Sequence, residues 1–155
     1  MMNISRAEFV DLGRILEIQK AAYQSEAALY NDTSIPPLLQ TLEELQAEYN
    51  TCVILKAVTE EGIIGSVRLR LEDEVALLGR LIVDPMHQGK GYGSALLDAA
   101  DSVFPQATCI ELFTGSRSER NIGIYERHGY VRTREAQLSS KVTLVYLRKQ
   151  ISRVL

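Results

Sequence analysis

Three glycines fall within five residues of the segment HQGKGYGS, which lies between an apolar run and a stretch with helical periodicity. A loop that leads into a helix presents backbone N–H groups that have no helical partner, and the helix dipole adds partial positive charge there. Glycines let an anion approach such a backbone closely. The residues expected to converge on the anion are Gln88, Gly89, Lys90, Gly91, Gly93 and Ser94. The pattern therefore favours a loop that binds a diphosphate.

Two other interpretations of the glycine loop compete with this one. A glycine-rich turn without any ligand would have the same composition. A dinucleotide-binding loop is the second, because GKGYGS nearly matches G-x-G-x-x-G and Glu111 follows at a spacing suited to a ribose contact. Against it, the loop follows an antiparallel series of strands, and Glu111 lies within its strand rather than at the strand's end. The P-loop pattern G-x-x-x-x-G-K-[ST] is absent.

A second segment, NIGIYERHGYV, completes a resemblance to a known family. QGKGYG fits the [RQ]-x-x-G-x-[GA] signature of the GNAT superfamily of acetyl-CoA-dependent N-acyltransferases, and it follows an apolar strand that ends in LIVDP. NIGIYERHGYV resembles the family's N-x-x-x-Y-x-x-x-G-[FY] segment, with Asn121, Tyr125, Gly129 and Tyr130 in register. The resemblance is detailed from about residue 51 onward and only topological before it.

The resemblance implies acetyl-CoA as co-substrate, with its diphosphate on the N–H groups of the glycine loop. The pantetheine arm would lie along backbone groups of the strand that precedes the loop, at Leu81, Ile82 and Val83. Asn121 would contact the pantetheine, and the Tyr125 hydroxyl would protonate the departing thiolate. These two residues are four apart on a predicted helix, so they share a face and can serve one ligand.

The implied reaction is direct attack of a primary amine on the thioester, with the oxyanion held by a backbone N–H of Ile82 or a neighbour. An alkyl amine has a pKa near ~10.4, so a base must deprotonate it. Many relatives supply a glutamate from the strand corresponding to VALLGRLIV, where the only ionisable residue here is Arg80. Glu26 and Glu111 are the candidate bases. The alternatives are that Glu26 is a solvated surface residue and that Glu111 is a partner for Arg80.

The acceptor site is expected to form from the first fifty residues, with Tyr23, Glu26, Tyr30 and Asp32 within reach of the acceptor. Acidic groups there favour a cationic amine, either a small molecule or a peptide. The competing function is a non-catalytic acyl-CoA-binding or sensing module of the same fold.

The elements that must position these residues follow from periodicity and turn signals. Apolar spacing predicts a strand over 2–6 and a helix over 11–28, and NDTSIPPLL is expected to be a loop. Thr41 and Glu44 have capping-box spacing at the start of a helix that runs to Tyr49. Three β-rich runs then form an antiparallel meander, in which the alternation of SVRLRL predicts one face exposed to solvent. A helix, a strand, a helix with Ser118 as its N-cap, and two strands over 130–133 and 142–148 complete the order.

This order predicts an α/β fold of the α+β type in one domain, 1–155. The expected sheet is GNAT-like, mixed and mostly antiparallel, with about seven strands flanked by about four helices and with strands 4 and 5 parallel and splayed. The last strand, VTLVYLRKQ, is expected to be an exposed edge that would allow homodimerisation.

Composition limits the classes of function. A net charge of −3 and the absence of a Lys and Arg cluster argue against nucleic-acid binding. Apolar runs too short to span a bilayer and an N-terminus unlike a signal peptide favour a cytoplasmic protein without membrane contact. Cys52 and Cys109 are expected to be reduced and buried, and His87 and His128 lack companion ligands, so no metal is expected.

Overall fold

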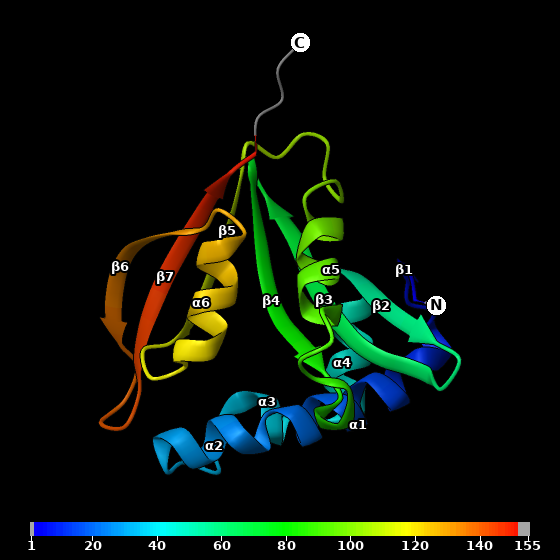
Figure 1. Ribbon diagram of the computed structural model, residues 1–155, viewed down its shortest axis with the longest axis horizontal. Helices are drawn as coiled ribbons and strands as arrows, with labels where there is room; N and C mark the ends of the chain where they lie inside the picture. Colours follow the sequence, from blue (N-terminus) through cyan, green and yellow to red (C-terminus); the bar gives the residue numbers. More distant parts are fainter. Residues whose placement is uncertain (1, 152–155) are drawn as a thin grey trace.

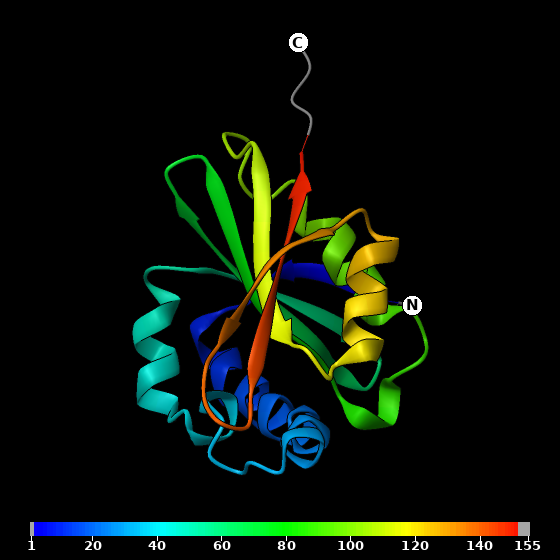
Figure 2. The same ribbon diagram turned by 90° about the vertical axis from the view of Figure 1, so that its left-hand side faces the viewer.

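The computed structural model describes residues 2–151 as a seven-stranded mixed sheet with helices on both faces (Figures 1 and 2). The strands are β1 (Asn3–Arg6), β2 (Val53–Thr59), β3 (Gly62–Glu72), β4 (Val75–Val83), β5 (Cys109–Gly115), β6 (Val131–Gln137) and β7 (Thr143–Gln150). The α-helices are α1 (Leu12–Ala22), α2 (Gln24–Tyr30), α3 (Pro36–Leu39), α4 (Leu42–Tyr49), α5 (Tyr92–Ala100) and α6 (Glu119–Arg127). Two 3-10 turns, η1 (Phe9–Asp11) and η2 (Pro85–His87), precede α1 and the glycine loop.

The sheet has the order β1-β2-β3-β4-β5-β7-β6, and among the described strands only the β4–β5 pair is parallel. This confirms the predicted mixed, mostly antiparallel fold. Apolar side chains are buried on both faces of the sheet. Leu96 and Leu97 of α5 and Ile122 of α6 pack on one face, while Ile15 of α1 and Leu45 of α4 pack on the other. The amphipathic spacing in each helix determines which side of that helix packs on the sheet.

The face of β3 expected to be exposed is covered at Ser66 and Arg68 and exposed at Arg70. Ser66 and Arg68 have exposed fractions of only 1% and 3%. The alternation in SVRLRL correctly marks two different faces, but α1 and α4 cover the polar one. Arg68 is tolerated there because the Glu48 carboxylate lies 3.0 Å from its Nη1 and the Gln40 Oε1 lies 3.1 Å away. The prediction of a solvated face was therefore wrong at Ser66 and Arg68, where the first fifty residues supply a polar cover, and right at Arg70.

The predicted helix over 11–28 is two helices. α1 ends at Ala22, Tyr23 has φ −81° and ψ −1°, and α2 begins at Gln24. The Ser25 hydroxyl donates to the Ala22 carbonyl at 3.2 Å, and such local bonding competes with the helical ladder. Apolar periodicity continues across the break, which is why the pattern did not reveal it.

The proline segment expected to be a loop contains the one-turn helix α3, with Pro36 at its first position. Proline suits the first turn of a helix, where its missing N–H costs nothing. The break at Tyr23 and this turn explain why the described chain has six α-helices rather than about four. The α4 capping box is confirmed, since the Thr41 hydroxyl accepts from the Glu44 N–H at 3.1 Å.

β4 and β5 diverge after a short parallel contact (Figure 1). Val75, Ala76 and Leu77 pair with residues 109–111, and beyond Leu77 no further β4–β5 pairs occur in the described sheet. On its other side, β4 carries one extra residue relative to β3 in the segment that includes Arg80, whose φ is +51°. Such a bulge bends a strand and redirects its side chains, at a local cost of about 1–2 kcal/mol for a left-handed non-glycine residue.

β7 is an interior strand, so the expectation of an exposed last strand was wrong. β5 pairs with one side of β7 and β6 pairs with the other. β6, the second-last strand in the sequence, forms the edge of the sheet, and β7, the last strand, lies between β5 and β6. The order of strands along the sequence does not reveal this arrangement. The argument for dimerisation through β7 is thereby removed.

Candidate active site

A cavity of about 1120 Å³ lies where β4 and β5 separate. The end of β4 and the glycine loop form one wall, and β5 and α6 form the opposite wall. α2 and the first residues of α3 close a third side. Segments far apart in the sequence therefore meet at the point where the parallel strands stop pairing, which is where ligands bind in many α/β sheets.

The glycine loop presents its backbone N–H groups to this cavity. From Gln88 to Ser94, no backbone N–H donates to an acceptor within the described chain, and the first that does is Ala95, to the Gly91 carbonyl at 3.0 Å. Gly89 and Gly91 have φ of +79° and +88°, and a Cβ at either position would meet no atom within 4 Å. The glycines are thus required by backbone conformation, and they leave the N–H groups accessible.

The structure brings most of the predicted cofactor residues together around the cavity. The residues that line it are Leu81, Ile82, Val83, Gln88, Gly89, Gly91, Gly93, Ser94, Asn121 and Tyr125. Lys90 is not among them. Because β5 has left the sheet at this level, the side of β4 facing β5 has no strand partner over residues 78–83.

α6 directs three polar side chains toward the cavity. Ser118, Asn121 and Tyr125 have i, i+3 and i+7 spacing and therefore share one face of the helix. The Glu26 Oε1 accepts from the Ser118 hydroxyl at 2.7 Å and from the Asn121 Nδ2 at 3.2 Å. No described residue donates to Oε2 of Glu26, so this oxygen can accept a proton or hydrogen bond from a ligand.

The Tyr30 hydroxyl supports this cluster through hydrogen bonds and is not free to bind a ligand in the cavity. The Arg117 N–H donates to the Tyr30 hydroxyl at 3.0 Å, and the Ser118 hydroxyl lies 2.8 Å from it. The single Ser118 proton is donated to Glu26, so Tyr30 is the donor to Ser118. Ser118 was expected only as a helix N-cap, but its side chain makes no capping bond.

Tyr125 is buried, with an exposed fraction of 7%, and no described residue forms a hydrogen bond with its hydroxyl. Burial raises the pKa of Tyr125 well above the ordinary ~10 of a phenol, and the neighbouring Tyr23 raises it further. The hydroxyl therefore stays protonated at neutral pH. It can donate a hydrogen bond to a ligand, while full proton transfer to a thiolate is less favourable than for a free phenol.

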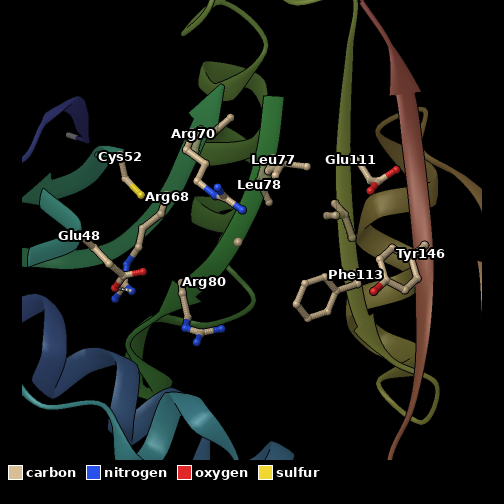
Figure 3. A pocket seen from close by; sticks show the side chains of 13 residues that line it. Glu48, Cys52, Arg68, Arg70, Leu77, Leu78, Arg80, Glu111, Phe113 and Tyr146 are labelled. Carbon is tan, nitrogen blue, oxygen red and sulfur yellow. Dashed lines mark hydrogen bonds and ion pairs between the residues drawn. The ribbon is translucent and has the colours of Figure 1, made fainter. Parts of the chain in front are cut away.

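Glu111 and Asp32 lie outside this cavity. The Glu111 Oε2 is 2.7 Å from the Arg148 Nε, and the carboxylate points toward β7 (Figure 3). The alternative interpretation, in which Glu111 is a partner for Arg80, was therefore wrong. The Asp32 Oδ1 accepts from the Ser34 N–H at 2.9 Å, and Asp32 serves the turn between α2 and α3. Of the two candidate bases, only Glu26 lines the cavity.

A smaller pocket of about 360 Å³ adjoins the large cavity between β4 and β5 (Figure 3). The residues that line both are Leu78, Gly79, Arg80, Leu112, Phe113 and Tyr146. Sequence reasoning gave Ser118 only the role of a helix N-cap and Arg80 only that of a partner for Glu111, and it placed neither in the site. The available signals were the i, i+7 spacing of Ser118 and Tyr125 and the single charge in the apolar run VALLGRLIV.

The donor set fits coenzyme A. Seven consecutive N–H groups without partners suit a diphosphate, the unpaired side of β4 suits the amides of a pantetheine arm, and the Tyr125 hydroxyl lies free on α6. Within residues 2–151, no three His, Cys, Asp or Glu side chains lie where they could hold a metal ion together. No helix in that range is both long and apolar enough to cross a membrane.

Comparisons with solved structures give the same fold. The ribosomal-protein-S18-alanine N-acetyltransferase of Escherichia coli has a TM-score of 0.81 at 16% identity, covering 100% of this chain and 97% of that one. The PaiA N-acetyltransferase of Thermoplasma acidophilum, solved with coenzyme A, has a TM-score of 0.79 at 18% identity, with coverages of 97% and 99%. A GNAT-family acetyltransferase of Staphylococcus aureus has a TM-score of 0.76 at 17% identity, with coverages of 98% and 100%.

Sequence comparison gives the family. No curated protein matches the chain. The model of the acetyltransferase (GNAT) family matches residues 13–130, which span the glycine loop, α6 and the helices that close the cavity. The chain belongs to the GNAT acetyltransferase family.

Proposed function

We propose that this protein is an N-acetyltransferase that moves an acetyl group from acetyl-CoA to a primary amine by direct attack. The observation that carries the proposal is the convergence, in one cavity, of an N–H-rich loop, the unpaired side of β4, Tyr125 and Glu26. Acetyl-CoA would supply an activated thioester. The protein would supply the position of the amine, an acceptor for its proton, and donors for the oxygen and sulfur that gain charge.

Glu26 is the proposed base. A primary amine is almost entirely protonated at neutral pH because its pKa is near ~10.4, and only the neutral form attacks. Ser118 and Asn121 hold Glu26 through Oε1, which fixes the carboxylate and leaves Oε2 directed to a further donor. Glu26 takes one proton from the ammonium group, directly or through a water, which gives the neutral amine that attacks. As the C–N bond forms and the C–S bond breaks, the second amine proton passes to the departing sulfur.

Tyr125 and β4 are the proposed donors to the developing charges. A backbone N–H near Ile82, on the unpaired side of β4, would bind the thioester oxygen as it gains negative charge. Tyr125 would donate a hydrogen bond to the departing sulfur. Because burial raises the pKa of Tyr125, stabilisation by hydrogen bonding is favoured over complete proton transfer.

The loop can be tested with a matched pair of glycine variants. Gly91→Ala and Gly62→Ala both place a Cβ at a positive φ with no atom within 4 Å, so both carry a similar backbone cost. Only Gly91 lines the cavity. Saturating CoA should raise the melting temperature of the wild type and of Gly62→Ala, and should raise that of Gly91→Ala far less. Equal shifts in all three proteins would contradict CoA binding at this loop.

Turnover is tested by thiol release from acetyl-CoA over a panel of primary amines. Acetylated product and free CoA should appear in equal amounts. A protein that binds CoA tightly but acetylates no amine would instead be an acyl-CoA-binding or sensing module.

A further inference from the structure

Arg80 projects into the space beside the proposed reaction centre. It belongs to the bulged segment of β4, and its φ of +51° takes the chain out of regular strand geometry. In Figure 3 the Phe113 ring extends from β5 toward β4, and the Arg80 side chain runs from the end of β4 toward the N-terminal helices. Both side chains line the large cavity and the smaller pocket that adjoins it. The bulge thus directs a cation to the junction of the two spaces.

The other charges around the smaller pocket are neutralised within the protein. Arg68 pairs with Glu48 at 3.0 Å, and Glu111 pairs with Arg148 at 2.7 Å. The pocket's remaining cation, that of Arg70, lies 3.2 Å from the Glu72 carboxylate.

Arg80 differs from these groups. No described carboxylate lies within ion-pair distance of it, and its buried Nε has no hydrogen-bond partner in the described chain. A partly buried cation without a counter-ion favours an anionic ligand group.

Tyr23 shows that this cation and the proposed base belong to one site. Tyr23, Glu26 and Arg80 all line the large cavity. Burial raises the pKa of Tyr23, the charge and hydrogen bond of Arg80 lower it, and the charge of Glu26 raises it. A ligand beside Tyr23 would therefore meet a carboxylate at one end and a guanidinium at the other. An amine that also carries an anionic group complements this arrangement.

We propose that the acetyl acceptor is a free α-amino acid, with its amine at Glu26, its carboxylate paired with Arg80 and an apolar side chain in the smaller pocket. The inference rests on the proposed acetyltransferase function and specifies its substrate class. Leu77, Leu112 and Phe113 give that pocket its apolar walls. A polyamine would bring a second cation toward Arg80, which is electrostatically unfavourable. Of the acidic groups expected to favour a cationic amine, Glu26 lines the cavity and Asp32 lies outside it.

Matched acceptors test the role of the carboxylate. Leucine, leucinamide and 3-methylbutylamine share one side chain, but only leucine carries the anion; phenylalanine and phenethylamine form a second set. In thiol-release assays, kcat/KM should be at least about 10-fold higher for each amino acid than for its decarboxylated amine, because a charged hydrogen-bonded pair is gained.

Arg80→Met should lower kcat/KM for leucine by about 10- to 100-fold, mainly through KM. The kcat/KM for leucine should then approach that for 3-methylbutylamine. Arg80→Lys should recover part of the preference, since it restores charge without a planar fork. Arg132→Met is the control, because Arg132 pairs with Glu126 on the surface and lines neither space. An undiminished CoA-induced rise in melting temperature would establish that the Arg80 variants are folded.

Two results would separate failure of this inference from failure of the proposed function. The wild type could have equal kcat/KM for the decarboxylated amines and the amino acids, or Arg80→Met could lower kcat/KM for both by the same factor. Either result would show that the substrate class is wrong while acetyl transfer stands. If no amine is acetylated although CoA binds, the catalytic proposal fails. The amino-acid site then remains testable by melting temperature with CoA present: leucine should raise it in the wild type but not in Arg80→Met, and the absence of this difference would exclude the site.

Discussion

Tyr125 combines a free hydroxyl with a buried ring, and this combination limits the chemistry open to it. Burial raises the pKa of the phenol, so the proton is held tightly. A tightly held proton makes a persistent hydrogen-bond donor and a poor acid. The side chain is therefore suited to stabilising a sulfur that becomes negative rather than to ionising itself.

Tyr125→Phe is expected to lower kcat by about 10- to 100-fold, which is the loss of one hydrogen bond to a charged group. The Kd for CoA, measured by calorimetry, should stay near the wild-type value because the ring remains. The wild-type kcat should show no alkaline fall from Tyr125 up to about pH 10, since a raised pKa keeps the donor protonated beyond the ordinary value. A fall in wild-type kcat below pH 9 that disappears in the Phe variant would contradict this role.

Glu26→Gln tests the base while keeping the shape of the side chain. The amide oxygen can still accept from Ser118 and Asn121, but it cannot take a proton from the amine. We expect kcat/KM at neutral pH to fall by about 10²- to 10⁴-fold. Glu17→Gln is the control, because Glu17 is exposed on α1 and lines neither pocket. Similar activity in the two variants would show that another group, or solvent, removes the proton.

Among the elements, the contact of α2 with the end of β5 depends on a missing side chain. Tyr30 lies against Gly115, where an added Cβ would overlap the Tyr30 ring and hydroxyl. That approach lets Tyr30 reach Arg117 and Ser118, which join α2 to the start of α6. A glycine at the end of β5 thus fixes the position of a helix that begins more than eighty residues earlier.

Gly115→Ala is expected to destabilise the protein by about 1–3 kcal/mol, because overpacking forces Tyr30 to move. It should also lower acetyltransferase activity, since Tyr30 supports Ser118 and, through it, Glu26. Gly13→Ala is the matched control: a Cβ there meets nothing within 4 Å, and alanine in a helix should stabilise by up to about 1 kcal/mol. Denaturant unfolding should show that Gly115→Ala lowers the free energy of unfolding and that Gly13→Ala raises it. An unchanged free energy of unfolding in Gly115→Ala would contradict the packing argument.

For the whole molecule, stability against acid depends in part on the end of β4. The Asp84 carboxylate accepts from the Met86 N–H at 3.0 Å and pairs with Arg14 at 3.0 Å, and these contacts hold the pKa of Asp84 below its ordinary value. A carboxyl group whose pKa is lowered by folding stabilises the protein above the unfolded-state pKa near ~3.9, and this contribution is lost as pH falls through the lower folded-state pKa.

Asp84→Asn should therefore lower the free energy of unfolding by up to about 1 kcal/mol at pH 7, since the exposed pair with Arg14 is weak and asparagine can still cap the turn. The difference from the wild type should shrink as pH falls below about 4. Urea unfolding at pH 7, 5 and 3 measures it. A difference that is constant across this range would assign the effect to packing rather than charge.

The sequence determined the strands and most of the helices, and it predicted the proposed cofactor side of the site, because these depend on local signals. Runs rich in β-forming residues form β2 to β4, a capping box starts α4, and glycines with positive φ shape the loop before α5. The motif around Asn121 and Tyr125 identified the family for the same reason. Each signal lies within about ten residues of chain, a distance over which periodicity and turn chemistry are reliable.

Only the tertiary structure decided which groups meet across long separations. It brought Glu26 to Ser118 and Asn121, paired Glu111 with Arg148, covered Arg68 with α4, and placed β7 inside the sheet. It also directed Arg80 into the cavity without a counter-ion. The physical reason is that these contacts follow from packing and strand order, which involve the whole chain. The sequence alone does not show which residue a charged side chain will pair with.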